Sequence, residues 1–353
     1  MDESDKGPMD RLSAHLDRAW DLVGRGDLQG AMRSAEKSLE IDDTSPEVRN
    51  LLGYVSAMEG RAEQAIEHYL EAIELDETFV EAMLNAAEVY LHPLHQWDEA
   101  AAMVERALEW IEEDEEMADA LLLVFDAQMG RGDEDAAKKV LGRIPTGPFE
   151  NAALTLGVGR AWFDVGEIER ADPLIRAAAE ADPSSADASY YLALLLERRG
   201  DRRAASVAFL QSRDADLRRP VPQDRPSPQE FEKRVRSGLG KLTAPASDVL
   251  DGALVIASDV PGAEVVADGV DPRAPVLLDD LSREGEPRRV GRVFVYQRNV
   301  ERLLTGRSLL ELEDVIAKAI ADEVRLTFEP PSVEAEAAGA RAPSATSEGE
   351  GGA

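Results

Sequence analysis

Residues 51–72 read LLGYVSAMEGRAEQAIEHYLEA, and their pattern predicts the architecture of the first two-thirds of the chain. Gly60 permits a tight turn between two helices, because glycine adopts backbone angles that other residues avoid. After the turn, Ala65, Tyr69 and Ala72 lie four and three residues apart, on one face of a helix. The small Ala65 lets this second helix approach the first, and Tyr69 fills the space toward the next helical unit. The stretch therefore predicts a helix–turn–helix unit.

The same pattern recurs along the chain with a period of about 34 residues. A glycine is followed five residues later by an alanine in the pairs Gly26/Ala31, Gly60/Ala65, Gly132/Ala137, Gly166/Ala171 and Gly200/Ala205. Ala100 completes the series, and residues 94–96 replace its glycine. The six alanines stand 34, 35, 37, 34 and 34 residues apart, so the first two-thirds of the chain is predicted to be a repeat array.

This pattern resembles the tetratricopeptide repeat, in which helix pairs stack into a right-handed superhelix. We count six repeats over residues 12–217, so the predicted fold class is mainly α, an α-solenoid. The third repeat departs most, since residues 91–95 are inserted where a short turn is expected.

The resemblance implies a concave groove, lined by the first helix of each repeat, that holds an extended peptide or a helix. The positions expected to line it are Trp20, Tyr54, Met58, Asn85, Glu88, Asp126, Met129, Arg160, Tyr191, Leu194 and Arg198. About half of these are expected to be packing residues instead. Asn85 resembles the asparagine that contacts peptide backbones in this family. The basic residues that grip a chaperone's C-terminal carboxylate are not arrayed around it.

Composition narrows the function classes. The 353 residues include 39 Lys+Arg and 71 Asp+Glu, a net charge of −32, which disfavours binding to nucleic acid or anionic membranes. Residues 1–228 carry about −24 of it, so a partner of basic and hydrophobic character is expected. The absence of cysteine excludes disulfides, thiol nucleophiles and thiolate zinc sites. Neither a signal peptide nor a membrane-spanning apolar run is evident, so a cytoplasmic location is predicted. The 32 Arg against 7 Lys indicate a GC-rich bacterial genome.

The rest of the chain divides by composition. Residues 1–11 are predicted to be a flexible N-terminus, 218–228 a Pro-rich, semi-rigid spacer and 332–353 a disordered tail. Residues 229–331 do not repeat, and their pattern predicts an α+β domain in the order helix, strand, strand, helix. The helices are expected at 229–242 and 309–328, the strands at 253–257 and 293–296, and a loop-rich stretch at 259–292.

Residues 292–302, RVFVYQRNVER, resemble the strand and following turn of the minimal zincin-like metallopeptidase family of bacteria, and residues 231–235 resemble its opening helix. In active members the final helix carries His-Glu-x-x-His, whose histidines bind zinc and whose glutamate activates water. In the best register, Glu323 matches that general base, and Asp322 and Leu326 occupy the histidine positions. A register one residue earlier is worse, with Ala321 and Arg325 in their place.

The available ligands argue against that activity. The four histidines, His15, His68, His92 and His95, all lie in the repeats, and residues 229–331 contain neither histidine nor cysteine. A catalytic zinc needs three protein ligands, and carboxylates alone suit calcium or magnesium. The domain is therefore predicted to be degenerate, without metal, cofactor or peptidase activity. Asp322 and Glu323 are then vestigial, or simply part of a solvated helix face.

Two further clusters have ordinary explanations. His92 and His95 are spaced to chelate a metal, but the intervening Pro93 and the loop position favour a structural insertion. The acidic run over residues 109–116 could bind a basic partner or calcium, yet it lacks the spacing and glycine of an EF-hand, which favours a solvated helix end.

The sequence supports three hypotheses. The first is a non-enzymatic protein-interaction scaffold, with the degenerate zincin-like domain as a second binding or regulatory module. The alternative is a metallopeptidase with Glu323 as general base and unconventional metal ligands such as Asp322 and Glu329. In the third, the C-terminal domain serves only to cap the apolar end of the solenoid.

Overall fold

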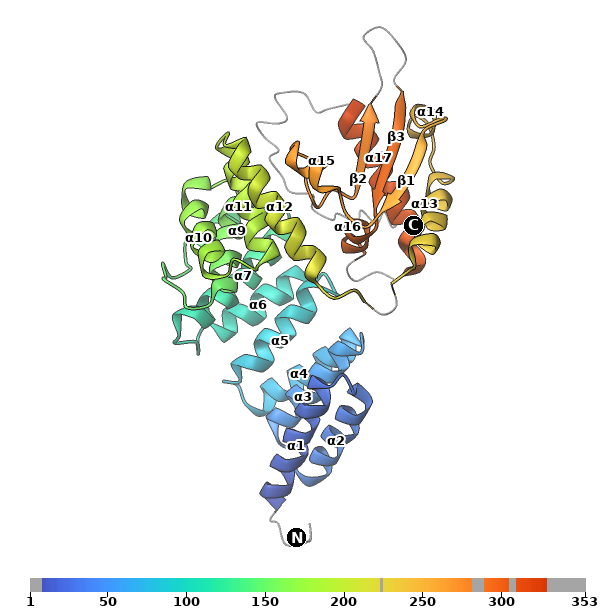
Figure 1. Ribbon diagram of the computed structural model, residues 1–353. Coiled ribbons are helices and arrows are strands. Elements are labelled where there is room, and N and C mark those ends of the chain that lie inside the picture. The colour runs from blue at the N-terminus through green and yellow to red at the C-terminus, as the bar shows by residue number, and fades with distance from the viewer. Residues whose placement is uncertain (1–7, 223–224, 281–288, 305–308, 329–353) are drawn as a thin grey trace, which may run out of the picture. The chain divides into compact units, whose positions relative to one another are not determined.

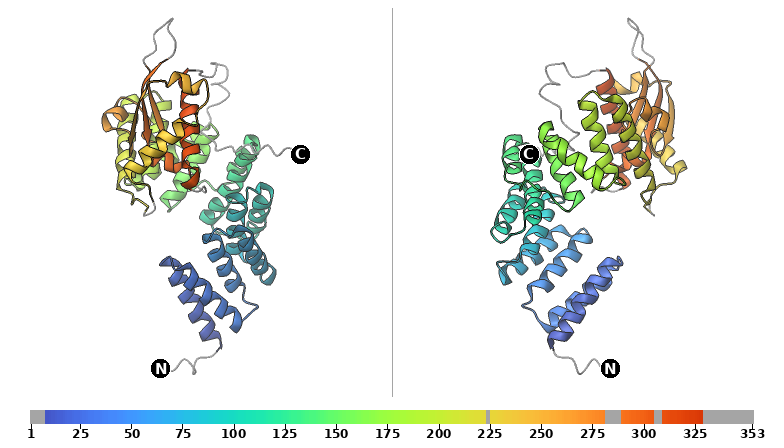
Figure 2. Two further views of the ribbon diagram at one scale, coloured as in Figure 1. Left: turned by 90° about the vertical axis from the view of Figure 1, so that its right-hand side faces the viewer. Right: turned by 60° about the vertical axis from the view of Figure 1, so that its left-hand side comes forward.

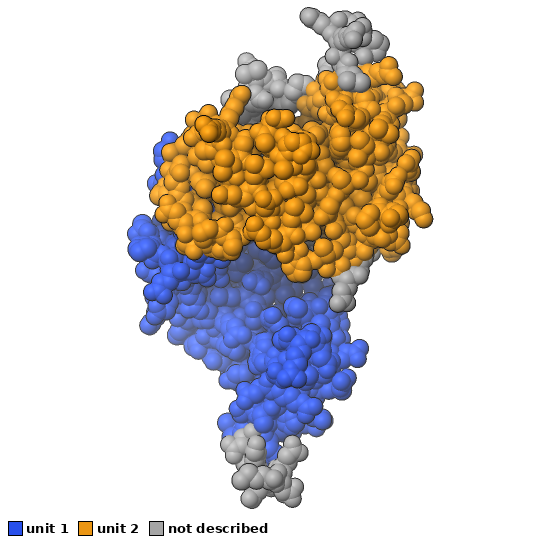
Figure 3. Space-filling view, viewed as in Figure 1, with its two compact units in different colours: residues 1–171 blue, residues 172–353 orange. Residues whose placement is uncertain are grey.

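The computed structural model of the chain describes residues 8–222, 225–280, 289–304 and 309–328. The predicted tail over 332–353, Glu329 and most of the predicted flexible N-terminus lie outside the described residues. The chain divides into two compact units, residues 1–171 and 172–353 (Figure 3), and each is described by itself.

The prediction of repeated helices is confirmed over the described residues between 8 and 218, where twelve consecutive helices follow one another as six pairs (Figure 1). They are α1 (Pro8–Gly24), α2 (Leu28–Ile41), α3 (Pro46–Met58), α4 (Ala62–Leu75), α5 (Val80–Leu91), α6 (Trp97–Ala107), α7 (Asp114–Gly130), α8 (Glu134–Leu141), α9 (Ala152–Asp164), α10 (Ile168–Ala181), α11 (Ala186–Arg198) and α12 (Arg202–Arg218). The boundary between the units falls inside α10.

The turn glycines do what the sequence requires of them. The five glycines of the repeating Gly/Ala pairs all have φ between 75° and 80°, in the left-handed region. At Gly60, the amide donates to Ala57 O and the next amide to Ser56 O, which ends α3 in a tight turn. In the third repeat His95 takes over this role with φ 53°, five residues before Ala100. A histidine therefore stands where the other repeats have glycine.

Packing inside a repeat depends on small residues facing large ones. A Cβ added at Gly53 would lie 2.6 Å from the Tyr69 ring, so α4 rests directly on the backbone of α3. Ala65 and Tyr69 are buried, and Tyr69 also packs with Ala86 and Val89 of α5. Tyr69 thus joins its own repeat to the next one, as predicted.

The non-repeating segment is an α+β domain. Its elements are α13 (Pro228–Leu239), α14 (Ala246–Val249), β1 (Leu254–Ser258), α15 (Ala263–Ala267), β2 (Val276–Asp280), β3 (Val290–Tyr296), α16 (Gln297–Arg302), a short 3-10 turn (Leu309–Glu311) and α17 (Leu312–Phe328). The four predicted elements are present within a few residues of their expected ends. The first helix ends at Leu239, three residues before its predicted end.

The stretch 259–292, predicted to be loop-rich, also contributes regular structure. It contains α15 and the strand β2, which pairs antiparallel with β3, while β1 pairs parallel with the other side of β3. The core is formed by side chains of α13, α17 and the three strands, with Phe231, Ile316 and Val293 almost fully buried. Figure 2 shows α17 lying alongside this sheet.

The predicted Pro-rich spacer is bonded to this domain where the structure describes it. Arg225 pairs with Asp259 and with Glu301 Oε2 at 2.8 Å, and Gln297 Nε2 donates to Pro226 O at 2.8 Å. These bonds hold the end of the spacer against β1 and α16.

Candidate binding surface on the helical repeats

The predicted groove residues recur at one position of the first helix of each repeat. Trp20, Tyr54, Asp126 and Arg160 lie eleven residues before their repeating alanine, and Glu88 lies twelve before its own because the third turn is longer. We call these five residues the central row. All are exposed or half-buried, as side chains available to a ligand must be.

The central row begins with aromatic side chains. The Trp20 and Tyr54 rings lie 5.2 Å apart, tilted by 59°, so α1 and α3 present one joined aromatic surface. Trp20 is 38% exposed, and Met58, one turn after Tyr54, is 56% exposed. Single exposed apolar side chains are common, but Trp20, Tyr54 and Met58 lie together, and a cluster of exposed apolar side chains is typical of an interaction site.

The row continues with charged side chains. Arg160 lies between two carboxylates, 3.9 Å from Asp126 and 3.8 Å from Asp164. Burial raises the pKa of Asp126, against the opposing effect of Arg160 and His92. Burial also raises the pKa of Asp164 to about 6, with Arg160 opposing the shift and Asp126 adding to it. One guanidinium therefore serves two carboxylates that water solvates poorly.

Asn85 has a structural partner. Its Nδ2 donates to Asn50 Oδ1 at 3.0 Å, and Asn50 Nδ2 donates to Glu81 Oε1 at the same distance. Asn50 is 2% exposed, so the amide of Asn85 is held in place by a buried neighbour. The half-buried Asn85 can still offer its remaining polar atoms to a peptide backbone.

The other predicted groove residues differ in exposure. Met129 is half-buried on α7. In unit 2, Tyr191 and Leu194 are half-buried and Arg198 is exposed, all on α11. Tyr191 packs edge-on against Tyr190 at 5.8 Å.

Sequence reasoning missed two members of this surface. Asp164 and His92 follow Arg160 and Glu88 by four residues, as Met58 follows Tyr54. That shared spacing was the available signal, because residues four apart lie on one helix face. His92 is exposed at the end of α5, close enough to Glu88 and Asp126 to act on their pKa values.

The two histidines of the third repeat have separate structural roles. His92 caps α5, whereas His95 forms the turn and packs against the Trp97 ring at 5.0 Å. The acidic run ends in the first turn of α7, where Glu115 accepts hydrogen bonds from the amides of Glu150 and Asn151. Carboxylates there complement the positive end of the helix dipole.

On the predicted active-site helix α17, the candidate residues face different surroundings. Glu323 is half-buried, and burial raises its pKa, with a hydrogen bond from Thr327 opposing the shift. Asp322 pairs with Arg325 at 3.0 Å, and Leu326 is 57% exposed. Within the described part of the chain, no three His, Cys, Asp or Glu side chains gather in a way that could hold a metal ion.

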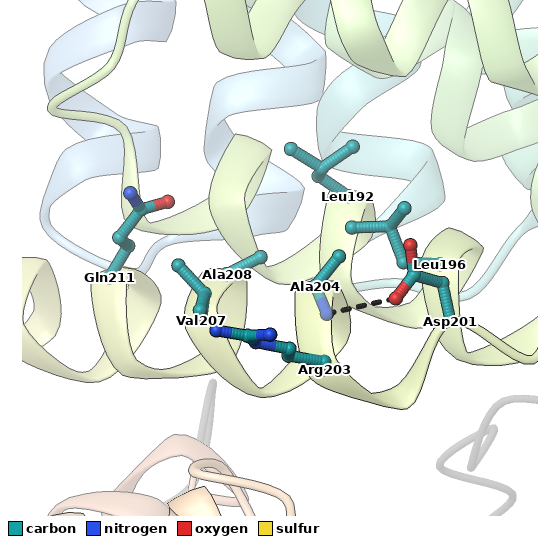
Figure 4. A pocket seen from close by; sticks show the side chains of 8 residues that line it. All are labelled: Leu192, Leu196, Asp201, Arg203, Ala204, Val207, Ala208 and Gln211. Atoms are coloured by element: carbon teal, nitrogen blue, oxygen red, sulfur yellow. Dashed lines mark hydrogen bonds between the residues drawn. The ribbon is translucent and has the colours of Figure 1, made fainter.

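A separate hollow lies on the last repeat. It has a volume of about 450 Å³ and is formed by α11 and α12, with Leu192, Leu196 and Val207 among its apolar walls (Figure 4). The Asp201 carboxylate at its rim accepts a hydrogen bond from the Ala204 amide, so that group already caps α12. Among the described helices, none is both long and apolar enough to cross a membrane.

Comparison with known proteins finds similarity within these helices. The tetratricopeptide repeat family model matches residues 16–78 and 157–214. PilF of Pseudomonas aeruginosa is 18% identical with a TM-score of 0.51, over 59% of this chain and 93% of that one. PilW, a widely conserved type IV pilus biogenesis factor, is 16% identical with a TM-score of 0.50, over 59% of this chain and 94% of that one. No curated protein matches the chain. Identities this low show likeness of fold alone, and both family matches lie within the helical repeats.

Proposed function

Starting from a chain that contains tetratricopeptide repeats, we propose that the protein is a non-enzymatic interaction scaffold, located in the cytoplasm. Its repeats bind a peptide or protein segment that carries both basic and apolar side chains. The central row is the observation that carries this proposal, because it joins an exposed aromatic surface to half-buried carboxylates along one position of the repeat.

The aromatic end of the row supplies apolar contact. Trp20, Tyr54 and Met58 stay partly in water in the free protein, so covering them would remove apolar surface from solvent. Aromatic rings lose little rotamer freedom on binding, and they dominate the energetics of many interfaces. A large aliphatic or aromatic side chain of the partner fits this end.

The charged end selects for a cation. Asp126 and Asp164 share the single guanidinium of Arg160, and burial has already removed part of their water. A lysine or arginine from the partner would pair with whichever of these two carboxylates Arg160 neutralises less. Such a contact adds specificity, since an acidic segment would be repelled by the same groups.

A peptide-binding assay tests this proposal. Fluorescence anisotropy of the full chain is measured with a labelled ten-residue peptide of lysine and leucine, and with a peptide in which glutamate replaces lysine. We expect binding of the first peptide only, weakened at least about ten-fold by Trp20→Ala or by Asp126→Asn. Glu36→Gln, which removes an exposed charge on α2, is the matched control. Equal affinity for both peptides, or variants that bind like the control, would refute the proposal.

For residues 229–331 we propose a degenerate zincin-like module without peptidase activity. The proposal rests on the sequence resemblance and on the donors present, since this segment has no histidine and no cysteine. Burial raises the pKa of Glu323, but Asp322 is paired with Arg325 and Leu326 cannot bind a metal. Peptide hydrolysis that is lost on Glu323→Gln would overturn it.

A further inference from the structure

The last repeat has no following repeat, yet its apolar end is covered. In the second repeat, Tyr69 lies four residues after Ala65 and is covered by Ala86 and Val89 of the next helix. Phe209 holds the same position in the last repeat, four residues after Ala205, and it is only 2% exposed. Its cover is Val266 of α15, which is fully buried and packs with Phe209 in one cluster.

A polar contact repeats in the same way. Asn50, fifteen residues before Ala65, donates a hydrogen bond to Glu81 at the start of the next repeat. Tyr190 lies fifteen residues before Ala205, and its hydroxyl donates to Asp271 Oδ2 at 2.8 Å. The segment after α15 therefore supplies to the last repeat the carboxylate that the second repeat receives from the repeat that follows it.

Ion pairs fasten the same segment to both helices of the last repeat. The Arg273 guanidinium lies 4.3 Å from the Tyr190 ring centroid and pairs with Asp187 on α11 at 2.6 Å. It also pairs with Asp216 on α12 at 3.2 Å, and Arg302 reaches the same carboxylate at 2.6 Å. The Asp216 side chain is 4% exposed, so its pairs with Arg273 and Arg302 are largely desolvated at the carboxylate and costly to break one partner at a time.

The segment belongs to the repeat by its packing. Val266 clusters with Ala193, Ala208 and Phe209, whereas the core of the α+β domain is formed by α13, α17 and the strands. Figure 1 shows α15 beside α12. Two backbone carbonyls complete the contact, since Ser206 Oγ donates to Ala267 O and Arg213 Nε to Pro261 O.

We propose that residues 261–273 act as a surrogate for the first helix of a seventh repeat and so terminate the array. The α+β domain presents this segment, and it holds α11 and α12 folded by covering the apolar surface that a further repeat would cover. The same cover denies that surface to a second copy of the chain. This inference does not depend on what the central row binds.

Hydrogen exchange of the full chain tests the cap. Val266→Asp places a charge against Phe209, and the control Ala267→Asp adds the same charge at an exposed neighbour. We expect exchange in α11 and α12 to rise at least about ten-fold in the first variant, while α13 and α17 keep their protection. Exchange in α11 and α12 that rises no more than in the control would overturn the proposal.

A second variant keeps the test decisive if Val266→Asp also loosens α13 and α17. Tyr190→Phe changes only the repeat side and removes the hydroxyl that donates to Asp271. We expect exchange over residues 262–275 to rise at least about three-fold, with α13 and α17 unchanged. Wild-type exchange in that segment would show that it is held by its own domain, and would overturn the proposal.

Discussion

Replacing Asp164 by asparagine should stabilise the protein at neutral pH and not at acidic pH. The Asp164 side chain is 20% exposed, and burial raises its pKa from 3.8 to about 6. Between these values the folded state holds a proton that the unfolded state has lost, so stability falls as pH rises through this window. Above pH 6 the penalty is complete, and asparagine escapes it because it carries no charge.

The expected magnitude comes from the shift. One pKa unit corresponds to about 1.36 kcal/mol, so the full window amounts to about 3 kcal/mol as an upper value. The attraction of Arg160 is already included in the shifted pKa. Constant effects of the amide, such as an altered hydrogen bond, act equally at every pH and cancel when two pH values are compared.

Urea unfolding at pH 4 and pH 7.5, followed by the helical signal, measures the effect. The difference in unfolding free energy between Asp164→Asn and wild type should grow in favour of the variant by about 1–3 kcal/mol between the two pH values. Glu36→Gln, an exposed change on α2, corrects for the general benefit of removing one negative charge from a chain of net charge −32. A difference that is the same at both pH values, after this correction, refutes the reasoning.

Three further outcomes are expected. Gly53→Ala should destabilise the protein by about 1–3 kcal/mol, because the new Cβ would lie 2.6 Å from the Tyr69 ring. The control Gly24→Ala, whose Cβ would have no atom within 4 Å, should destabilise the protein much less. Thermal melts of the two variants measure the difference. His95→Gly should leave stability unchanged or raise it by up to about 1 kcal/mol, since glycine adopts φ 53° without strain. A loss of stability of more than about 1 kcal/mol in the same melts would mean that the contact between the His95 and Trp97 rings contributes more than the backbone strain costs. Purified protein dialysed against zinc should retain no stoichiometric metal by elemental mass spectrometry. One tightly held zinc per chain that persists when His92 and His95 are both replaced by alanine would contradict the proposal of a degenerate module.

The repeats could be predicted because the residue type at each key position is set by the local backbone conformation and by packing between neighbouring helices. Gly60 and Ala65 occur where a turn and a close helix approach demand them, and the demand recurs every 34 residues or so. The same logic placed the irregularity of the third repeat in residues 94–96, where the structure shows His95 in the left-handed conformation.

The C-terminal half was harder to predict because its decisive contacts are distant in sequence. The strand β2 follows Pro272 and Pro275 and ends in two aspartates, so its five residues carry little strand signal of their own. It forms because β3 offers a free edge. Arg273 meets Asp187, 86 residues earlier, and no periodicity in the sequence connects them.

The candidate binding surface was predictable in part for a related reason. The resemblance to a known repeat indicates which position of the first helix is expected to face a ligand, and that position led to Trp20, Tyr54, Asp126 and Arg160. It did not show that Arg160 is shared between two carboxylates. The four-residue spacing of Asp164 indicates one of them, but Asp126 lies on another helix, and only the packing of α7 against α9 brings it to Arg160. Side-chain pairing, rather than fold, was the missing information.

Two kinds of position within each repeat differ in how much their residue type varies from one repeat to the next. The position of Tyr69 carries only buried apolar residues in the other repeats, namely Ala35, Val104, Leu141, Ile175 and Phe209. The position of the central row instead carries Trp, Tyr, Glu, Asp and Arg in successive repeats of unit 1. If the central row binds the partner as proposed, substitutions at this position change the contacts with the partner while the helix packing around it stays intact. Under that proposal, a related protein could change its partner by substitutions at the central row, one repeat at a time, without a change in the helix packing.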